Sequence, residues 1–111
     1  TDVIVGFPGE TEADFQESKN FISEIGFYDM HIFKYSRRKG TRADEMQGQI
    51  TEKVKKERSK ILLDFALQDS EKFREQFIGK RTDVLIEEVR EMEGQKYYTG
   101  FTMEWRTTLP R

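Results

Sequence analysis

Hydrophobic and polar positions in the first part of the chain predict a strand, a turn and a helix. An apolar run at 2–5 is typical of a buried strand, and it starts so early that we expect the chain to begin inside a longer protein. Gly6 and Gly9 then favour a tight turn. Thr11 can cap a helix, with Asp14 completing an imperfect capping box. The apolar residues that share one face of this helix are Phe15, Phe21, Ile22 and Ile25.

A second apolar stretch at 30–35 alternates between two sides and predicts another strand. Strand, helix and strand together make a βαβ unit, which implies two parallel strands. Parallel sheets are normally covered on both faces by helices, and two parallel strands cannot bury themselves. We therefore expect the rest of the sheet to come from sequence outside this chain or from another copy of it.

A polar loop at 36–49 leads into a long helix, predicted from near Thr51 to near Gly79. The loop is longer than most connectors, which favours a functional or mobile segment. The helix would be roughly 40 Å long, so we expect it to bridge two bodies. Its apolar residues repeat at helical spacing: Val54, Ile61, Leu62, Phe65, Phe73 and Phe77.

The periodicity changes to two after Gly79, where apolar and polar residues begin to alternate. Glu93 and Gly94 favour a hairpin turn before a strand at 96–102, and a further short strand is expected around Trp105. This pattern predicts a small antiparallel β module with too few strands for a closed barrel.

Composition indicates a folded chain. The 111 residues are 36% charged and 35% hydrophobic, and they include nine Phe, four Tyr and one Trp. A disordered chain has fewer aromatic residues. No apolar stretch approaches the roughly 20 residues that cross a bilayer, and no signal-peptide pattern is visible. We expect a cytoplasmic protein without membrane contact.

The chain has no cysteine and only one histidine, His31. This composition excludes disulfides, thiolate zinc sites, cysteine nucleophiles and an iron–sulfur cluster held by this segment alone. A lone histidine in a strand is usually packed or hydrogen-bonded, so His31 is assigned no role. The net charge of −2 gives no general attraction to nucleic acid, and such contacts would need a local patch.

The turn at 4–11 is the first candidate binding segment. In α/β folds, ligands collect beyond the carboxyl ends of parallel strands, and Gly6 and Gly9 would let a ligand approach the backbone. It is not a P-loop, because no Lys follows the second glycine. The same residues also fit a plain tight turn.

The basic segment at 34–42 is the second candidate, because it carries cations without an acidic residue at a strand end. Its cations could meet phosphates. It could equally be a solvated loop balanced by Asp44 and Glu45. A third basic stretch opens the long helix and is interpreted as a solvated face, since Glu52 and Glu57 can pair with it. Its cations are Lys53, Lys55, Lys56, Arg58 and Lys60.

Two strings resemble the radical S-adenosylmethionine tRNA methylthiotransferases. The first is Ile-Val-Gly-Phe-Pro-Gly-Glu-Thr at 4–11, and the second is Tyr-Ser-Arg-Arg-Lys-Gly-Thr at 35–41. The helix sequence at 54–59 and the β segment from Phe77 are also similar to this family. The resemblance implies an α/β fold with the C-terminal βαβ part of a TIM-like barrel at 1–50, a bridging helix at 51–79 and a truncated TRAM-like β domain at 80–111.

The resemblance also implies an enzyme that inserts sulfur and a methyl group at an unactivated C–H bond. Its cofactors would be S-adenosylmethionine and two [4Fe-4S] clusters. The Arg37–Arg38 form of the second string is most similar to the branch that acts on N6-threonylcarbamoyladenosine beside the tRNA anticodon. Sister branches modify isopentenyladenosine or a ribosomal protein.

By the same resemblance, residues at the two strand ends would bind S-adenosylmethionine: Ile4, Val5, Gly6, Tyr35 and Ser36. Arg37, Arg38 and Arg42 would face the modified nucleoside or tRNA phosphates. No catalytic or metal-binding residue is assigned. The cluster cysteines would lie upstream in the missing N-terminal part of the same protein, so this segment is expected to hold no cofactor and to have no turnover of its own.

Two readings compete with the enzyme segment. One is a tRNA-binding module without catalysis, which would use the basic segment and the aromatic residues of the β module. Those aromatics are Tyr97, Tyr98, Phe101 and Trp105. The other is an oligomerising segment, because unpaired strand edges invite self-association.

Overall fold

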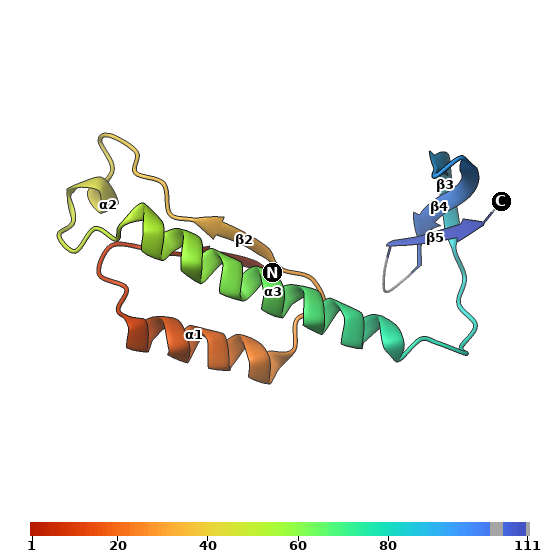
Figure 1. Ribbon diagram of the computed structural model, residues 1–111, viewed down its shortest axis with the longest axis horizontal. Coiled ribbons are helices and arrows are strands. Elements are labelled where there is room, and N and C mark those ends of the chain that lie inside the picture. Colours follow the sequence, from red (N-terminus) through yellow and green to blue (C-terminus); the bar gives the residue numbers. More distant parts are fainter. Residues whose placement is uncertain (103–105, 111) are drawn as a thin grey trace. The chain divides into compact units, whose positions relative to one another are not determined.

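The computed structural model describes residues 1–102 and 106–110, which form two compact units. The first runs from Thr1 to Gln76 and the second starts at Phe77. Figure 1 shows the helices and the short parallel strands of the first unit, and the antiparallel strands of the second. The fold is therefore mixed α/β within the described residues, with each unit built on its own sheet.

The first unit opens with the predicted strand, helix and strand: β1 (Asp2–Val5), α1 (Glu12–Ile25) and β2 (His31–Lys34). β1 and β2 are parallel, as predicted. Thr11 caps α1 by accepting a hydrogen bond from the backbone N–H of Asp14, whose carboxylate accepts from the backbone of Thr11 in return. This reciprocal cap confirms the predicted helix start.

The polar loop contains a short helix that the sequence pattern did not predict, α2 (Arg42–Glu45), capped by Thr41. The long helix α3 (Glu52–Glu75) begins after Thr51 as expected, but it ends before Gly79. Among the described residues, no helix is both long and apolar enough to cross a membrane.

Helices α1 and α3 pack on the same face of the β1–β2 sheet. The buried core consists of Val5, Phe15, Ile22, Met30 and Leu62, which come from both helices, from β1 and from the segment before β2. Val3 and Ile32, which pair across the strands, pack against this core. The helices therefore cover the face of the sheet on which Val3, Val5 and Ile32 lie.

The opposite face of this sheet is open within the described chain. Ile4 and Phe33 pair across the strands on that face and are 57% and 52% exposed. One prediction about α1 was wrong. Phe21 and Ile25 are exposed, because Phe15 and Ile22 alone point at the sheet, while Phe21 and Ile25 form a separate row.

The second unit is a three-stranded antiparallel sheet of β3 (Leu85–Met92), β4 (Gln95–Phe101) and β5 (Arg106–Pro110). The hairpin turn between β3 and β4 is the predicted one, and Glu93 and Gly94 both have the positive φ that a type I′ turn requires. The strand expected around Trp105 is centred on a residue outside the described ranges. β5 begins directly after it.

Candidate functional site

The carboxyl ends of β1 and β2 bring the two candidate segments together. The backbone N–H of Tyr35 donates a hydrogen bond to the carbonyl of Val5, with a nitrogen–oxygen distance of 2.8 Å. The ring of Phe7, in the turn after β1, meets the Tyr35 ring edge-on, with centroids 5.3 Å apart. Two stretches about thirty residues apart in sequence thus share one edge of the sheet, as parallel strands require.

A glycine in the first segment lies directly under a lysine from α3. A Cβ at Gly6 would overlap the Cγ of Lys55, and Gly6 has a φ of +74°, which side chains rarely adopt. The Lys55 side chain continues over the Tyr35 ring, with its ammonium nitrogen 5.2 Å from the ring centroid. Lys55 is only 4% exposed, so its stem fills the space between the two strand ends.

Arg58, one helical turn further along α3, makes a buried ion pair with the end of the same turn. Its Nη1 lies 2.6 Å from Oε1 of Glu10 and also donates to the Glu10 carbonyl at 3.0 Å. The same carboxylate oxygen accepts a hydrogen bond from the backbone N–H of Gly6 at 3.0 Å. One arginine, through one glutamate, thereby contacts both ends of the turn at 6–10.

The interpretation of the α3 cations as a solvated face was therefore wrong for Lys55 and Arg58. Both are buried, whereas Lys53, Lys56 and Lys60 are exposed as expected. The spacing from Lys55 to Arg58 to Leu62 places all three on the core stripe of the helix. That stripe was visible in the sequence, but the paired charges around it favoured the solvent-facing interpretation.

The loop at 36–49 is folded over the same edge by its own contacts. Arg37 binds Asp44 through a 2.7 Å contact to the carboxylate and a 2.9 Å hydrogen bond to the carbonyl. The Gln49 side chain donates to two carbonyls of the α2 region. Gly9 in the first turn donates a backbone hydrogen bond of 2.8 Å to the carbonyl of Gly48. The loop and the turn are thus fastened to each other.

A hollow of about 440 Å³ opens on the uncovered face of the sheet at this edge. It is lined by the apolar residues Ile4 and Phe33, by five residues of the basic segment and by Ala43 after it. The five are Lys34, Tyr35, Ser36, Arg38 and Thr41. Among the predicted cofactor residues, Ile4, Tyr35 and Ser36 lie here. The Val5 side chain is instead buried among the helices, and Gly6 lies under Lys55. Contacts from these two residues would come from their backbone.

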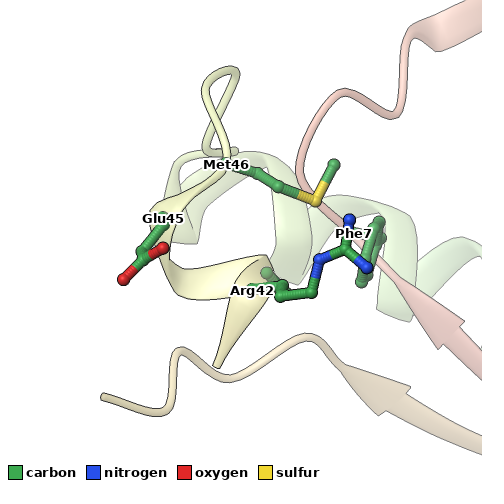
Figure 2. Close-up of a pocket in the computed structure, with 5 residues that line it drawn as sticks. Phe7, Arg42, Glu45 and Met46 are labelled. Carbon is green, nitrogen blue, oxygen red and sulfur yellow. The ribbon is translucent and has the colours of Figure 1, made fainter. Parts of the chain in front are cut away.

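A second hollow of about 620 Å³ lies between the turn and α2. Figure 2 shows the Arg42 side chain beside the Phe7 ring, with the Met46 thioether on the same wall and the Glu45 carboxylate directed away. The three arginines predicted to meet tRNA are therefore placed differently. Arg38 and Arg42 line separate hollows and are exposed, while Arg37 is bound to Asp44.

One carboxyl near this edge, that of Glu52, has a pKa below its ordinary value. A hydrogen bond from Lys34, together with its positive charge, lowers the pKa of the Glu52 carboxyl, and the nearby Lys55 adds to the effect. Glu52 Oε2 lies 3.2 Å from the Lys34 nitrogen, and its Oε1 lies 3.6 Å from that of Lys55.

His31 lies at the other end of β2, where its side chain is exposed and its Nδ1 is 3.3 Å from Asp2 Oδ1. It contributes nothing to this site.

The residues at this edge do not fit an iron–sulfur cluster. The chain contains no cysteine, and within the ranges 1–102 and 106–110 no three His, Asp or Glu side chains gather as a metal site would need. The first hollow, which is lined by both apolar and polar residues, has the chemistry of an organic ligand site instead.

Comparison with known proteins finds that the chain is similar to tRNA-modifying enzymes. No family model matches the sequence. The threonylcarbamoyladenosine tRNA methylthiotransferase MtaB of Bacillus subtilis is 41% identical over 92% of this chain. A tRNA-2-methylthio-N(6)-dimethylallyladenosine synthase of Acetivibrio thermocellus is 42% identical, also over 92%. The MtaB of Thermotoga maritima is 46% identical over 78%.

The aligned residues make up 23%, 21% and 20% of these relatives, so the chain spans about a fifth of their length. The match includes relatives named for two different modified adenosines, at nearly the same identity. Over the length that it shares with them, the chain is similar to a segment of tRNA methylthiotransferases.

Proposed function

We propose that this chain is part of a radical S-adenosylmethionine enzyme that adds a methylthio group to N6-threonylcarbamoyladenosine in tRNA. The observation that carries the proposal is the identity of 41–46% to tRNA methylthiotransferases over most of the chain. Because the chain has no cysteine, the iron–sulfur clusters would be bound by residues outside it, and this segment alone would have no turnover.

The choice of nucleoside is the finer part of the proposal. It rests on the consecutive Arg37 and Arg38 of the second motif, since relatives named for either nucleoside are similarly close. Dimethylallyladenosine is therefore the second candidate substrate. The two differ in chemistry, because the threonylcarbamoyl group carries a carboxylate and the dimethylallyl group is apolar.

The fold supports a place for each unit in such an enzyme. Two parallel strands covered by helices on one face, with an open face opposite, suit the C-terminal part of a TIM-like barrel at 1–50. α3 would then be the bridging helix at 51–79, and the antiparallel unit would be the TRAM domain at 80–111.

S-adenosylmethionine would occupy the hollow at the strand ends. Ile4 offers an apolar surface for the adenine, Tyr35 and Ser36 offer the adjoining strand end, and Val5 and Gly6 offer backbone groups. When bound, this cofactor would supply the radical chemistry that activates the C–H bond. The residues of this chain would bind and orient it, and would exclude water from it.

Arg38 and Arg42 would serve the RNA. Both are exposed, and within the described part of the chain neither side chain makes an ion pair, so their charges are available to phosphates or to a nucleoside carboxylate. Arg37 would instead stabilise the loop that carries Arg38 and Arg42, because its guanidinium is already bound to Asp44.

The test is to express the complete reading frame that contains this chain, purify the protein without oxygen, and supply tRNA carrying either nucleoside. Mass spectrometry should find a methylthio gain on threonylcarbamoyladenosine and none on dimethylallyladenosine. A gain on dimethylallyladenosine alone would keep the enzyme class and move the substrate. A protein without iron–sulfur absorbance and without gain on either nucleoside would contradict the enzyme proposal.

A further inference from the structure

Arg58 is a buried cation to which neither the sequence motifs nor the proposed function gives a role. It is 6% exposed, and its guanidinium also lies over the Phe15 ring at 5.4 Å. Its Nε is buried and finds no hydrogen-bond partner among the residues that the structure describes. Burying a charge in this way costs much of what the ion pair returns, so a pair of this kind is a weak source of net stability. Its contribution is better sought in the geometry that it imposes.

The geometry imposed is that of the turn at 6–10. Arg58 holds the Glu10 backbone directly through its carbonyl, and it holds Gly6 indirectly through the Glu10 carboxylate, whose Oε1 accepts from both. The turn contains Gly6 and Gly9, which both have a positive φ. Glycine has the widest choice of backbone conformations of any residue. A single buried side chain thus contacts both ends of a turn that contains two glycines with positive φ.

The position of this turn determines what the site presents. The turn carries Phe7, which packs on Tyr35 and walls the hollow of Figure 2, and it directly follows Ile4 and Val5. We propose that Arg58 is a positioning residue. Acting through Glu10, it holds the turn in the conformation that binds S-adenosylmethionine. The cofactor named here rests on the proposed function.

The test compares variants of the complete protein that contains this chain, purified without oxygen. Arg58→Met keeps much of the side-chain volume and removes the charge, and Arg58→Lys keeps the charge. Lys60→Met removes an exposed cation from the same helix and serves as the matched control. Hydrogen exchange of peptides covering 4–11 measures the turn. The KM for S-adenosylmethionine and kcat at saturation measure its consequence.

For Arg58→Met we expect faster exchange at 4–11 and a KM raised about tenfold, with kcat changed by less than about threefold. Arg58→Lys should recover part of the KM, and Lys60→Met should match the wild type. A general loss of folding would lower the active fraction and kcat without this separation. Unchanged exchange, or faster exchange with an unchanged KM, would overturn the proposal.

Glu10→Ala removes the carboxylate that joins Arg58 to Gly6 and leaves the arginine in place. If Arg58 acts through Glu10, adding Glu10→Ala to Arg58→Met should raise the KM no further than Arg58→Met alone, because the arginine variant has already lost its contacts to Glu10. Additive effects would overturn the proposal. If the wild type neither binds S-adenosylmethionine nor methylthiolates tRNA, the proposed function fails by itself. The exchange data on the same variants would then still decide whether Arg58 holds the turn, and unchanged exchange would refute that part.

Discussion

The turn at 6–10 and the loop at 36–49 follow neighbouring parallel strands, yet they are held in opposite ways. The turn is held by two buried cations of α3: Arg58 pairs with Glu10, and the Lys55 stem lies against Gly6. The loop is fixed mainly from within, by the exposed Arg37 on Asp44 and by Gln49 on its backbone. The turn is therefore anchored to the helix by buried contacts, and the loop is held by contacts among its own residues.

This difference separates the arginines by what they can do. A guanidinium that is buried and paired can transmit position but cannot reach RNA, whereas an exposed guanidinium without a partner can meet a phosphate. By this criterion Arg58 belongs to the cofactor side of the proposed site, and Arg38 and Arg42 belong to the RNA side. Arg37 is exposed but already paired, so it supports its neighbours.

The largest effect is expected from Arg58→Met. It leaves the Glu10 carboxylate in a largely buried position without its cation, which should lower the free energy of unfolding by about 3 kcal/mol. The displacement of the urea midpoint measures this loss. Lys60→Met should shift the midpoint little, and an equal shift in both variants would show that the buried pair is not special.

Gly6→Ala should come next. The new methyl group meets the Lys55 stem and must adopt a positive φ, so we expect a loss of about 2 kcal/mol. Gly9→Ala is the matched control, since it has a similar φ of +86° but no atom within 4 Å of the added Cβ. Equal losses in the two variants would mean that Lys55 yields without cost and does not constrain the turn.

Arg37→Ala should have a smaller effect on stability. The Arg37 side chain is more than half exposed to water, which screens its pair with Asp44, so we expect a loss of about 0.5 kcal/mol in urea denaturation. Hydrogen exchange at 36–46 should nevertheless increase, because the loop loses its internal brace. A loss as large as that of Arg58→Met would contradict the contrast between the two segments.

The smallest effect concerns the helix that the turn leads into. Backbone and side-chain hydrogen bonds from Thr11 hold the pKa of Asp14 below its ordinary value of 3.8. A carboxyl with a lowered folded pKa stabilises the protein above its unfolded pKa, and that contribution is lost as pH falls through the folded pKa. Denaturation midpoints of wild type and Asp14→Asn should therefore differ at neutral pH and converge below pH 3.8. A constant difference would refute the link.

Much of the first unit could be predicted because its signals are local. The run at 2–5, the Thr11 cap and the alternation at 30–35 each depend on neighbouring residues, and the parallel pairing followed from their order. The roles of Lys55 and Arg58 were missed because their partners are about 50 residues away in sequence, while acidic residues nearby offered a plausible local pairing.

The same limit explains the errors of smaller scale. α2 is one turn long and has no apolar periodicity to predict it. Phe21 and Ile25 fit a helical face by spacing, but which row meets the sheet depends on how α1 is rotated against it. The cofactor and RNA roles at the strand ends came from resemblance to a family, and they stay predictions for Ile4, Ser36 and Arg38.

The division of the arginines can be tested most directly by the salt dependence of tRNA binding to the complete protein. Arg42→Ala should reduce the slope of the logarithm of the binding constant against the logarithm of the salt concentration by about 1, which corresponds to one lost phosphate contact. Arg58→Met should leave this slope unchanged even if the affinity falls. A reduced slope for Arg58→Met, or an unchanged slope for Arg42→Ala, would contradict the assignment of the buried arginine to position and the exposed arginine to RNA.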